Sequence, residues 1–172
     1  MTAEQHILFR EKQHFTQVWL WAVILGVALL FWVGFVYQVL LGETFGNRPV
    51  PDVMLTIITI VIGIGLPYFF YHISLRTEVW PGELQVRFYP FHRRPVKIPL
   101  HLVRDFERKT YNPIQDYGGW GIRWGVKGKA YNMSGTEGVL LYFYNHPALL
   151  IGSQEPDALF EAIRAARSMK QV

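Results

Sequence analysis

Two long apolar runs near the beginning of the chain limit its possible folds more than any other feature. The first, Val18 to Leu41, has 24 residues without a formal charge, and the second, Val53 to Ile73, has 21 with a possible charge on His72 alone. At about 1.5 Å per residue, a helix of the first length spans roughly 36 Å, enough to cross a hydrocarbon core of about 30 Å. Because a buried helix of a soluble protein is rarely apolar on all faces, both runs are predicted to be transmembrane helices.

The connection between the two runs, Gly42 to Asp52, has 11 residues, so the helices are predicted to form an antiparallel hairpin. The first run is longer than the apolar region of a cleaved signal peptide, about 7–15 residues, and no small-x-small cleavage site follows it. The connection carries one basic residue, Arg48, whereas basic residues flank the other ends of both helices: Arg10, Lys12, Arg76, Arg87, Arg93, Arg94 and Lys97. The positive-inside rule therefore predicts that both termini are cytoplasmic.

Small residues in the two runs have two interpretations. Ala22 and Gly26 in the first helix, with Gly63 and Gly65 in the second, can form a close-packed face for a partner helix. Alternatively, these glycines are simply tolerated, as they are in many membrane helices, and Pro67 adds a kink. No charged residue lies at membrane depth, which argues against a transporter or a proton relay, because both need ionisable groups there.

From Leu75 onward the pattern changes to the period-two alternation of half-buried strands. Pro81-Gly82 predicts a turn between the first two strands, and Gly135-Thr136-Glu137 predicts a second hairpin. The segment from Gly118 to Gly128 is interpreted as a glycine-rich loop. The expected strands are residues 77–80, 84–88, 96–98, 103–111, 129–134, 138–144 and 149–151.

The last predicted element is an amphipathic helix. Pro156 suits its first position, and Ser153 or Glu155 can cap it. Its apolar stripe consists of Leu159, Phe160, Ile163 and Ala166. About seven antiparallel strands closed by one C-terminal capping helix is the order of elements in a pleckstrin-homology-like β-barrel.

Several short motifs resemble an uncharacterised bacterial family of two-helix membrane proteins with a cytoplasmic pleckstrin-homology-like domain. The motifs are residues 9–11, 19–21, 77–79, 91–94, 98–100, 117–123, 130–135 and 149–156. The resemblance implies a cytoplasmic N-terminal segment (1–15), a transmembrane hairpin (16–74, with helices at about 18–41 and 53–73) and a cytoplasmic domain (75–172). It implies no activity, because no activity is established for that family.

The sequence favours a protein without catalytic chemistry. It has no cysteine, and its six histidines have no zinc-ligand spacing. Gly128-Lys129 is followed by Ala130 where a P-loop needs Ser or Thr, and no G-x-S-x-G nucleophile elbow occurs. We therefore expect no enzyme activity, no metal and no cofactor.

The candidate contact residues are His92, Arg93, Arg94 and Lys97, together with Trp120 and Arg123. Residues 75–172 contain 14 Lys and Arg against 9 Asp and Glu, and each basic group near an anionic membrane surface contributes about 1 kcal/mol. A solvated turn that only obeys the positive-inside rule explains the basic cluster equally well.

The expected function is that of a non-enzymatic protein in the bacterial inner membrane. Its cytoplasmic domain is expected to be a protein-interaction or assembly-stabilising module, as in an accessory subunit of a larger complex. Its expected partners are membrane lipids and a protein partner or a second copy of the chain, and not nucleic acid. The alternative is a sensor of anionic lipid headgroups.

Overall fold

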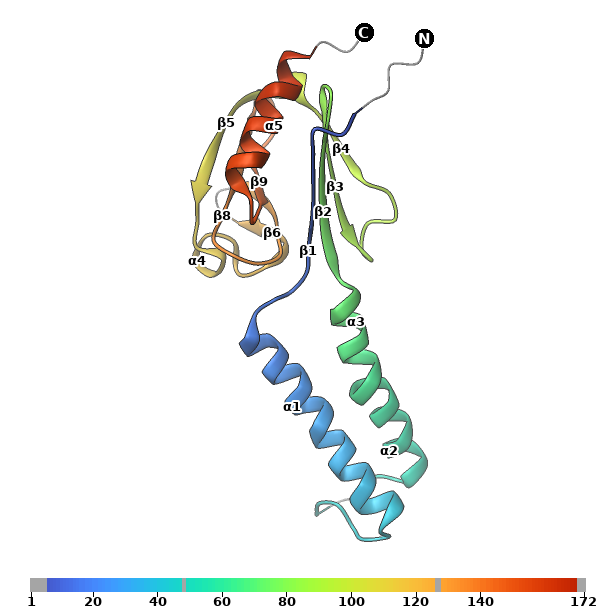
Figure 1. The fold of residues 1–172 in the computed structure, drawn as a ribbon. Coiled ribbons are helices and arrows are strands. Elements are labelled where there is room, and N and C mark those ends of the chain that lie inside the picture. The colour runs from blue at the N-terminus through green and yellow to red at the C-terminus, as the bar shows by residue number, and fades with distance from the viewer. Residues whose placement is uncertain (1–5, 48, 126–127, 170–172) are drawn as a thin grey trace. The chain divides into compact units, whose positions relative to one another are not determined.

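The chain forms two compact units in the computed structural model, which describes residues 6–47, 49–125 and 128–169. Residues 16–72 form a helical unit (Figure 1). The described residues up to Phe15 join those from Ile73 onward in a second, mainly β unit. Arg48, which the topology prediction used, lies outside the described residues.

The helical unit is a pair of long apolar helices, as predicted. The first helix consists of α1 (Val18–Phe35) and a π-helical continuation, η1 (Val36–Leu40). The second consists of α2 (Asp52–Ile58), the π-helical segment η2 (Thr59–Gly65) and α3 (Leu66–His72). Both are long and apolar enough to cross a membrane, and their ends agree with the predicted ranges to within one residue.

Two polar side chains connect the helices of this unit. The hydroxyl of Thr59 donates to the carbonyl oxygen of Phe31 at 3.2 Å. The side-chain amide of Gln38, the one strongly polar residue of the first apolar run, donates to the carbonyl of Val50 and to Oδ1 of Asp52, both at 2.7 Å. These bonds satisfy polar groups that would otherwise be costly in an apolar medium.

Of the four small residues predicted to pack helices, one lies at a close contact. A Cβ atom placed on Gly63 would lie 2.7 Å from Nε1 of Trp32, so only glycine fits there. A Cβ on Gly26 would meet nothing within 4 Å, and Ala22 and Gly65 are exposed. Within the hairpin, the buried positions are instead Ile24, Ala28, Gly34, Gln38, Leu55 and Thr59.

We expect Gly63→Ile to destabilise the hairpin by about 1–3 kcal/mol, because the new side chain must displace Trp32. The measurement is an SDS titration of the detergent-solubilised chain followed by tryptophan fluorescence. Gly26→Ile adds the same side chain in open space and is the matched control. Equal midpoints for the two variants would contradict the packing role of Gly63.

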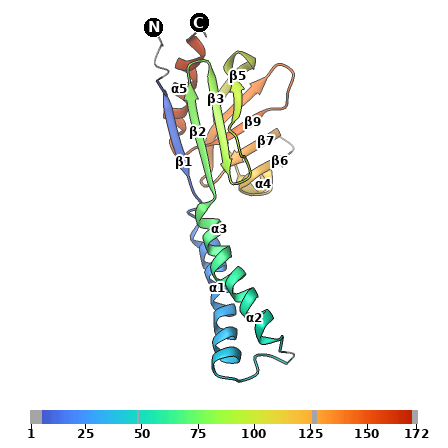
Figure 2. The same cartoon turned by 90° about the vertical axis from the view of Figure 1, so that its right-hand side faces the viewer.

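The first sheet of the β unit, sheet A, is antiparallel and contains a strand that the sequence analysis missed. Its order is β1-β2-β3-β4, which Figure 2 shows. The hairpin predicted around Pro81-Gly82 is confirmed as β2 and β3. The unpredicted strand, β1, precedes the first helix and pairs with β2, which follows the second. The strands are β1 (Phe9–Gln13), β2 (Ser74–Trp80), β3 (Glu83–Tyr89) and β4 (Val96–Pro99).

The second sheet, sheet B, has the order β5-β8-β9-β7-β6 and differs from the prediction in its pairing. The hairpin expected around Gly135-Thr136-Glu137 is wrong, because β9 lies between β7 and β8 and runs parallel to β7. All four residues of β9 are buried, so it needs a strand on each side. Strand β6 lies in the expected glycine-rich loop. The strands are β5 (Val103–Thr110), β6 (Gly121–Gly125), β7 (Gly128–Asn132), β8 (Glu137–Phe143) and β9 (Leu149–Gly152).

The prediction of a closed barrel is also wrong, because the two sheets are open. A short 3-10 helix, η3 (Leu100–Leu102), leads from sheet A to sheet B. The C-terminal helix α5 (Pro156–Ser168) contacts strands of both sheets. Three residues of its predicted stripe, Leu159, Ile163 and Ala166, are fully buried, whereas Phe160 is only partly buried and its ring lies 5.0 Å from that of Phe106. Helix α5 thus covers apolar surface that closure of a barrel would otherwise bury.

A short helix, α4 (Pro113–Tyr117), covers another apolar cluster on sheet B. The side chain of Asn112 caps its N-terminus by accepting from the backbone N–H groups of Ile114 and Gln115, both at 3.1 Å. Burial raises the pKa of Tyr111, which belongs to this cluster, to about 12. The cluster consists of Tyr111, Tyr117, Ala130, Leu140 and Leu150.

Strand β1 is fastened to the start of α5 as well as to β2. The carboxylate of Glu11, which is buried, accepts from Oγ of Ser153 at 2.7 Å and from the backbone N–H of Gln154 at 2.8 Å. The side chain of Gln13 donates to the carbonyl of Gly152 at 2.8 Å. One face of strand β1, with Phe9, Glu11 and Gln13, is therefore part of the core of the β unit.

We expect Glu11→Ala to destabilise the β unit by about 2–3 kcal/mol, because it leaves one buried and one partly buried donor without their acceptor. In a domain of this size the loss corresponds to a fall of roughly 10 °C in the unfolding midpoint. The measurement is near-UV circular dichroism of the full chain in detergent. Lys12→Ala, at the exposed neighbouring position, should change the free energy of unfolding by less than about 0.5 kcal/mol.

Candidate interaction surface

The outer face of sheet A concentrates basic side chains from all four of its strands. Residues that pair across neighbouring strands point to the same face of a sheet. The pairing of β1, β2 and β3 therefore places Lys12, Arg76 and Arg87 in one row. The next row contains Arg10, Glu78, Gln85 and Lys97. We call these seven residues the basic face.

Two carboxylates compensate part of this positive charge. Oε1 of Glu78 lies 3.0 Å from Nε of Arg10 and 2.5 Å from Arg76. Glu83, beside the basic face, pairs with Lys97 at 3.4 Å and accepts from Gln85 at 2.6 Å. Five basic side chains thus face two carboxylates, which leaves an excess of three positive charges. Like charges directly opposite each other destabilise a sheet, so an anion bound here would stabilise the face.

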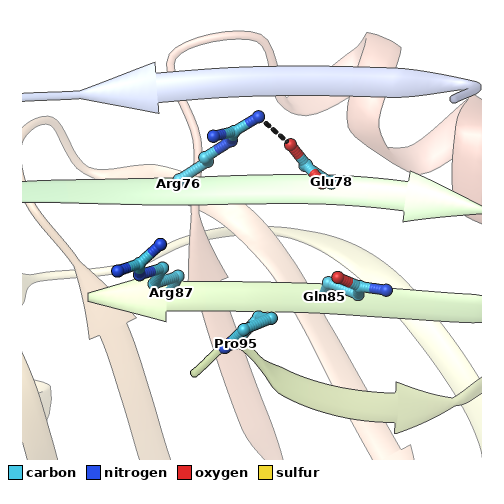
Figure 3. Close-up of a pocket in the computed structure, with 5 residues that line it drawn as sticks. All are labelled: Arg76, Glu78, Gln85, Arg87 and Pro95. Carbon is cyan, nitrogen blue, oxygen red and sulfur yellow. Dashed lines mark ion pairs between the residues drawn. The ribbon is translucent and has the colours of Figure 1, made fainter. Parts of the chain in front are cut away.

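A shallow depression of about 130 Å³ lies on the basic face. Figure 3 shows Arg76 and Arg87 on adjacent strands at one end of it, Glu78 and Gln85 at the other, and Pro95 beside β3 between Arg87 and Gln85. Pockets for drug-sized molecules measure about 300–1,000 Å³, so this depression is too small for such a ligand. It is large enough for a single carboxylate or phosphate group, the anions that guanidinium groups bind best.

His92, one of the predicted contact residues, fixes the loop between β3 and β4. Its Nδ1 accepts from the backbone N–H of Phe88 at 3.2 Å, and the backbone N–H of His92 donates to the carbonyl of Phe88 at 2.7 Å. Its ring also contacts that of Tyr131, with centroids 5.5 Å apart. Burial, assisted by the positive charge of Lys129, lowers the pKa of His92 below its ordinary value of 6.5. The ring is therefore neutral at pH 7 and acts as an acceptor.

A neutral His92 makes the β unit sensitive to acid. Because its folded-state pKa lies below the unfolded value, its contribution is present above pH 6.5 and is lost as the pH falls through the folded-state pKa. His92→Asn keeps an acceptor for Phe88 but does not titrate. We expect the unfolding midpoint of the variant to fall less than that of the wild type between pH 7 and pH 5, as measured by thermal denaturation in detergent. Parallel pH profiles would contradict this role.

The six predicted contact residues lie on two different sheets. Arg93 and Arg94 are exposed in the loop before β4, and Lys97 lies on β4. On sheet B, Nε1 of Trp120 donates to the carbonyl of Gly135 at 3.3 Å.

Arg123, on β6 of sheet B, is exposed and makes a local bond. Its Nε donates to the carbonyl of Trp120 at 2.8 Å. Trp120 and Arg123 therefore belong to one local arrangement, separate from the residues around β4.

A second polar depression, of about 360 Å³, lies beside the start of α5. Arg108 and Asp157 form an ion pair at its rim. This pairing raises the pKa of the exposed Arg108, which is already charged at neutral pH. Within residues 6–47, 49–125 and 128–169, no group of three or more His, Cys, Asp or Glu side chains is arranged to hold a metal ion.

Comparison with known proteins assigns nearly the whole chain to one family. A family model matches residues 1–169. The chain belongs to DUF6141, a family of unknown function. Among curated proteins, none matches it. Membership of DUF6141 confirms the resemblance to a family without an established activity, so the function of this DUF6141 protein has to be argued from its own geometry.

Arg10, Lys12, Arg76 and Arg87 were predicted from the sequence to indicate membrane topology and not to form a contact surface. They meet on one face because β1 pairs with β2 across the whole helical hairpin. Phe9-Arg10-Glu11-Lys12-Gln13 carries a weak signal for this strand, because its two basic residues alternate with non-basic ones and the burial of β1 alternates in the same way.

Proposed function

We propose that the chain is a non-enzymatic integral membrane protein whose β unit is a protein-interaction module that stabilises a larger membrane assembly. The observation that supports this most directly is the excess of positive charge on the basic face. The partner surface would be an acidic segment of another membrane protein, because electrostatic complementarity gives such contacts their specificity.

The helical unit would serve as a transmembrane anchor. Only 17% and 11% of the residues in the most apolar windows of its two helices are buried, whereas a core helix of a soluble protein is mostly buried. Strands β1 and β2 are paired neighbours, and they continue into α1 and from α3 respectively. This connectivity supports placing both helix ends on one side of the membrane. Basic residues near those ends favour the cytoplasmic side of a bacterial inner membrane.

The β unit would be a relative of pleckstrin-homology-like domains. Two sheets followed by a C-terminal helix support this likeness, whereas the open sheets and the parallel pair of β7 and β9 are departures from it. A protein partner or a second copy of the chain, rather than nucleic acid, would occupy the basic face. The net charge of +4 is modest for a nucleic-acid-binding protein.

The test is co-purification of the full chain from native membranes in mild detergent. We expect one protein, or a second copy of the chain, in stoichiometric amount. Arg87→Glu and Lys12→Glu should each reduce its recovery at least about tenfold, the effect of losing about 1.4 kcal/mol of binding free energy. Arg164→Glu makes the same charge change on α5, at an exposed position outside the basic face, and should leave recovery unchanged.

Recovery of the chain as a lone monomer would contradict the proposal, as would equal recovery with all three variants. A second candidate function, binding of anionic lipid headgroups, is favoured by one observation: the position of the loop between β3 and β4.

A further inference from the structure

We propose that the loop between β3 and β4, residues 90–95, together with Tyr89 at the end of β3, contacts the anionic surface of the membrane in which the helices are anchored. This inference rests on the proposed transmembrane anchor and adds a lipid surface to the contacts of the β unit. Its evidence is the place of the loop in sheet A, its side chains and its internal bonds.

The loop leaves sheet A at the end where the chain connects to both helices. Tyr89, the last residue of β3, pairs with Ser74, the first residue of β2. Ser74 follows the last residue of α3 by two positions, and Gln13, the last residue of β1, precedes Val18 of α1 by five. If the helices cross a membrane, these short connections keep this end of sheet A close to the membrane surface.

The exposed side chains of the loop are of the kinds found at membrane interfaces. Phe91 is 60% exposed and Tyr89 45% exposed, and Arg93 and Arg94 are exposed beside them. Aromatic rings concentrate at the level of lipid headgroups, and arginine pairs with their phosphates. The loop sequence, Tyr-Pro-Phe-His-Arg-Arg-Pro, contains no acidic residue.

The loop is also held in one conformation. His92 bonds twice to Phe88, and its carbonyl accepts from Nε of Arg87 at 3.3 Å. The ring of Phe91 lies 5.8 Å from that of Phe88, and the guanidinium of Arg87 lies 5.9 Å from the ring of Tyr89. Because the loop is ordered before it meets a lipid surface, little conformational entropy is lost on contact.

The charge of the basic face favours an anionic lipid surface over a neutral one. The row of Lys12, Arg76 and Arg87 crosses sheet A near the same end, since Arg76 is two residues from Ser74. The acidic Glu78 and Glu83 lie farther along the strands. Basic side chains are therefore concentrated where an anionic bilayer surface would be.

The absence of cysteine allows a direct test with the full chain in nanodiscs. A single cysteine is introduced by Phe91→Cys and labelled with an environment-sensitive fluorophore, and lipids carrying a headgroup spin label are added as quencher. The control is Ser168→Cys, at the other end of sheet A. Gly82, in the turn after β2, donates to the carbonyl of Ala166 at 3.0 Å, which places the end of α5 there.

We expect at least twofold stronger quenching at position 91 than at position 168 in nanodiscs that contain phosphatidylglycerol. In nanodiscs of phosphatidylcholine alone, the quenching at position 91 should be weaker. Adding Arg93→Glu and Arg94→Glu should lower it to the level of position 168. Equal quenching at the two positions would overturn the proposal, and equal quenching with and without phosphatidylglycerol would overturn the recognition of anionic lipid.

A third labelled position separates failure of this inference from failure of the anchor. Leu29 is an exposed residue of α1, so a label introduced by Leu29→Cys should be quenched by spin labels on the lipid acyl chains. Without that quenching, the proposed anchor fails. With it, and without quenching at position 91, only the inference about the loop fails.

Discussion

The pairing of β1 with β2 is the interaction on which the rest of the structure depends. It joins residues 9–13 to residues 75–79, across both long helices and their connection. Without β1, the edge of β2 would be unpaired, and Glu11 and Gln13 could not bond to the residues that precede α5. Through the same pairing, the strand that precedes the helical hairpin and the strand that follows it are neighbours in one sheet.

This pairing also creates the basic face. Arg10 and Lys12 come from one side of the hairpin, while Arg76 and Arg87 come from the other. Separately, each pair is an ordinary set of basic residues flanking a long apolar helix. Together in adjacent rows, with Glu78 compensating Arg10 and Arg76, they form a surface suited to an anion.

Local patterns predicted local structure well. The uncharged runs predicted both helices, Leu84-x-Val86-x-Phe88 with Pro81-Gly82 predicted the first hairpin, and Leu159, Ile163 and Ala166 predicted the buried face of α5. The sequence could not predict the order of strands. Turn residues indicate which consecutive strands form hairpins, whereas β9 lies between β7 and β8 because all its residues need burial, and no local motif indicates that position. Arg93, Arg94 and Lys97 are neighbours in the sequence and were therefore easy to single out, but the basic face depends on the register of distant strands.

The position of β1 before the first helix has a consequence for synthesis of the protein. β1 leaves the ribosome first, whereas β2 follows it only after some 60 further residues. At about 5–20 residues per second, β1 waits roughly 3–12 seconds for its partner. Sheet A can therefore form only after both apolar helices have been synthesised. The helices thus emerge from the ribosome before the β unit can fold.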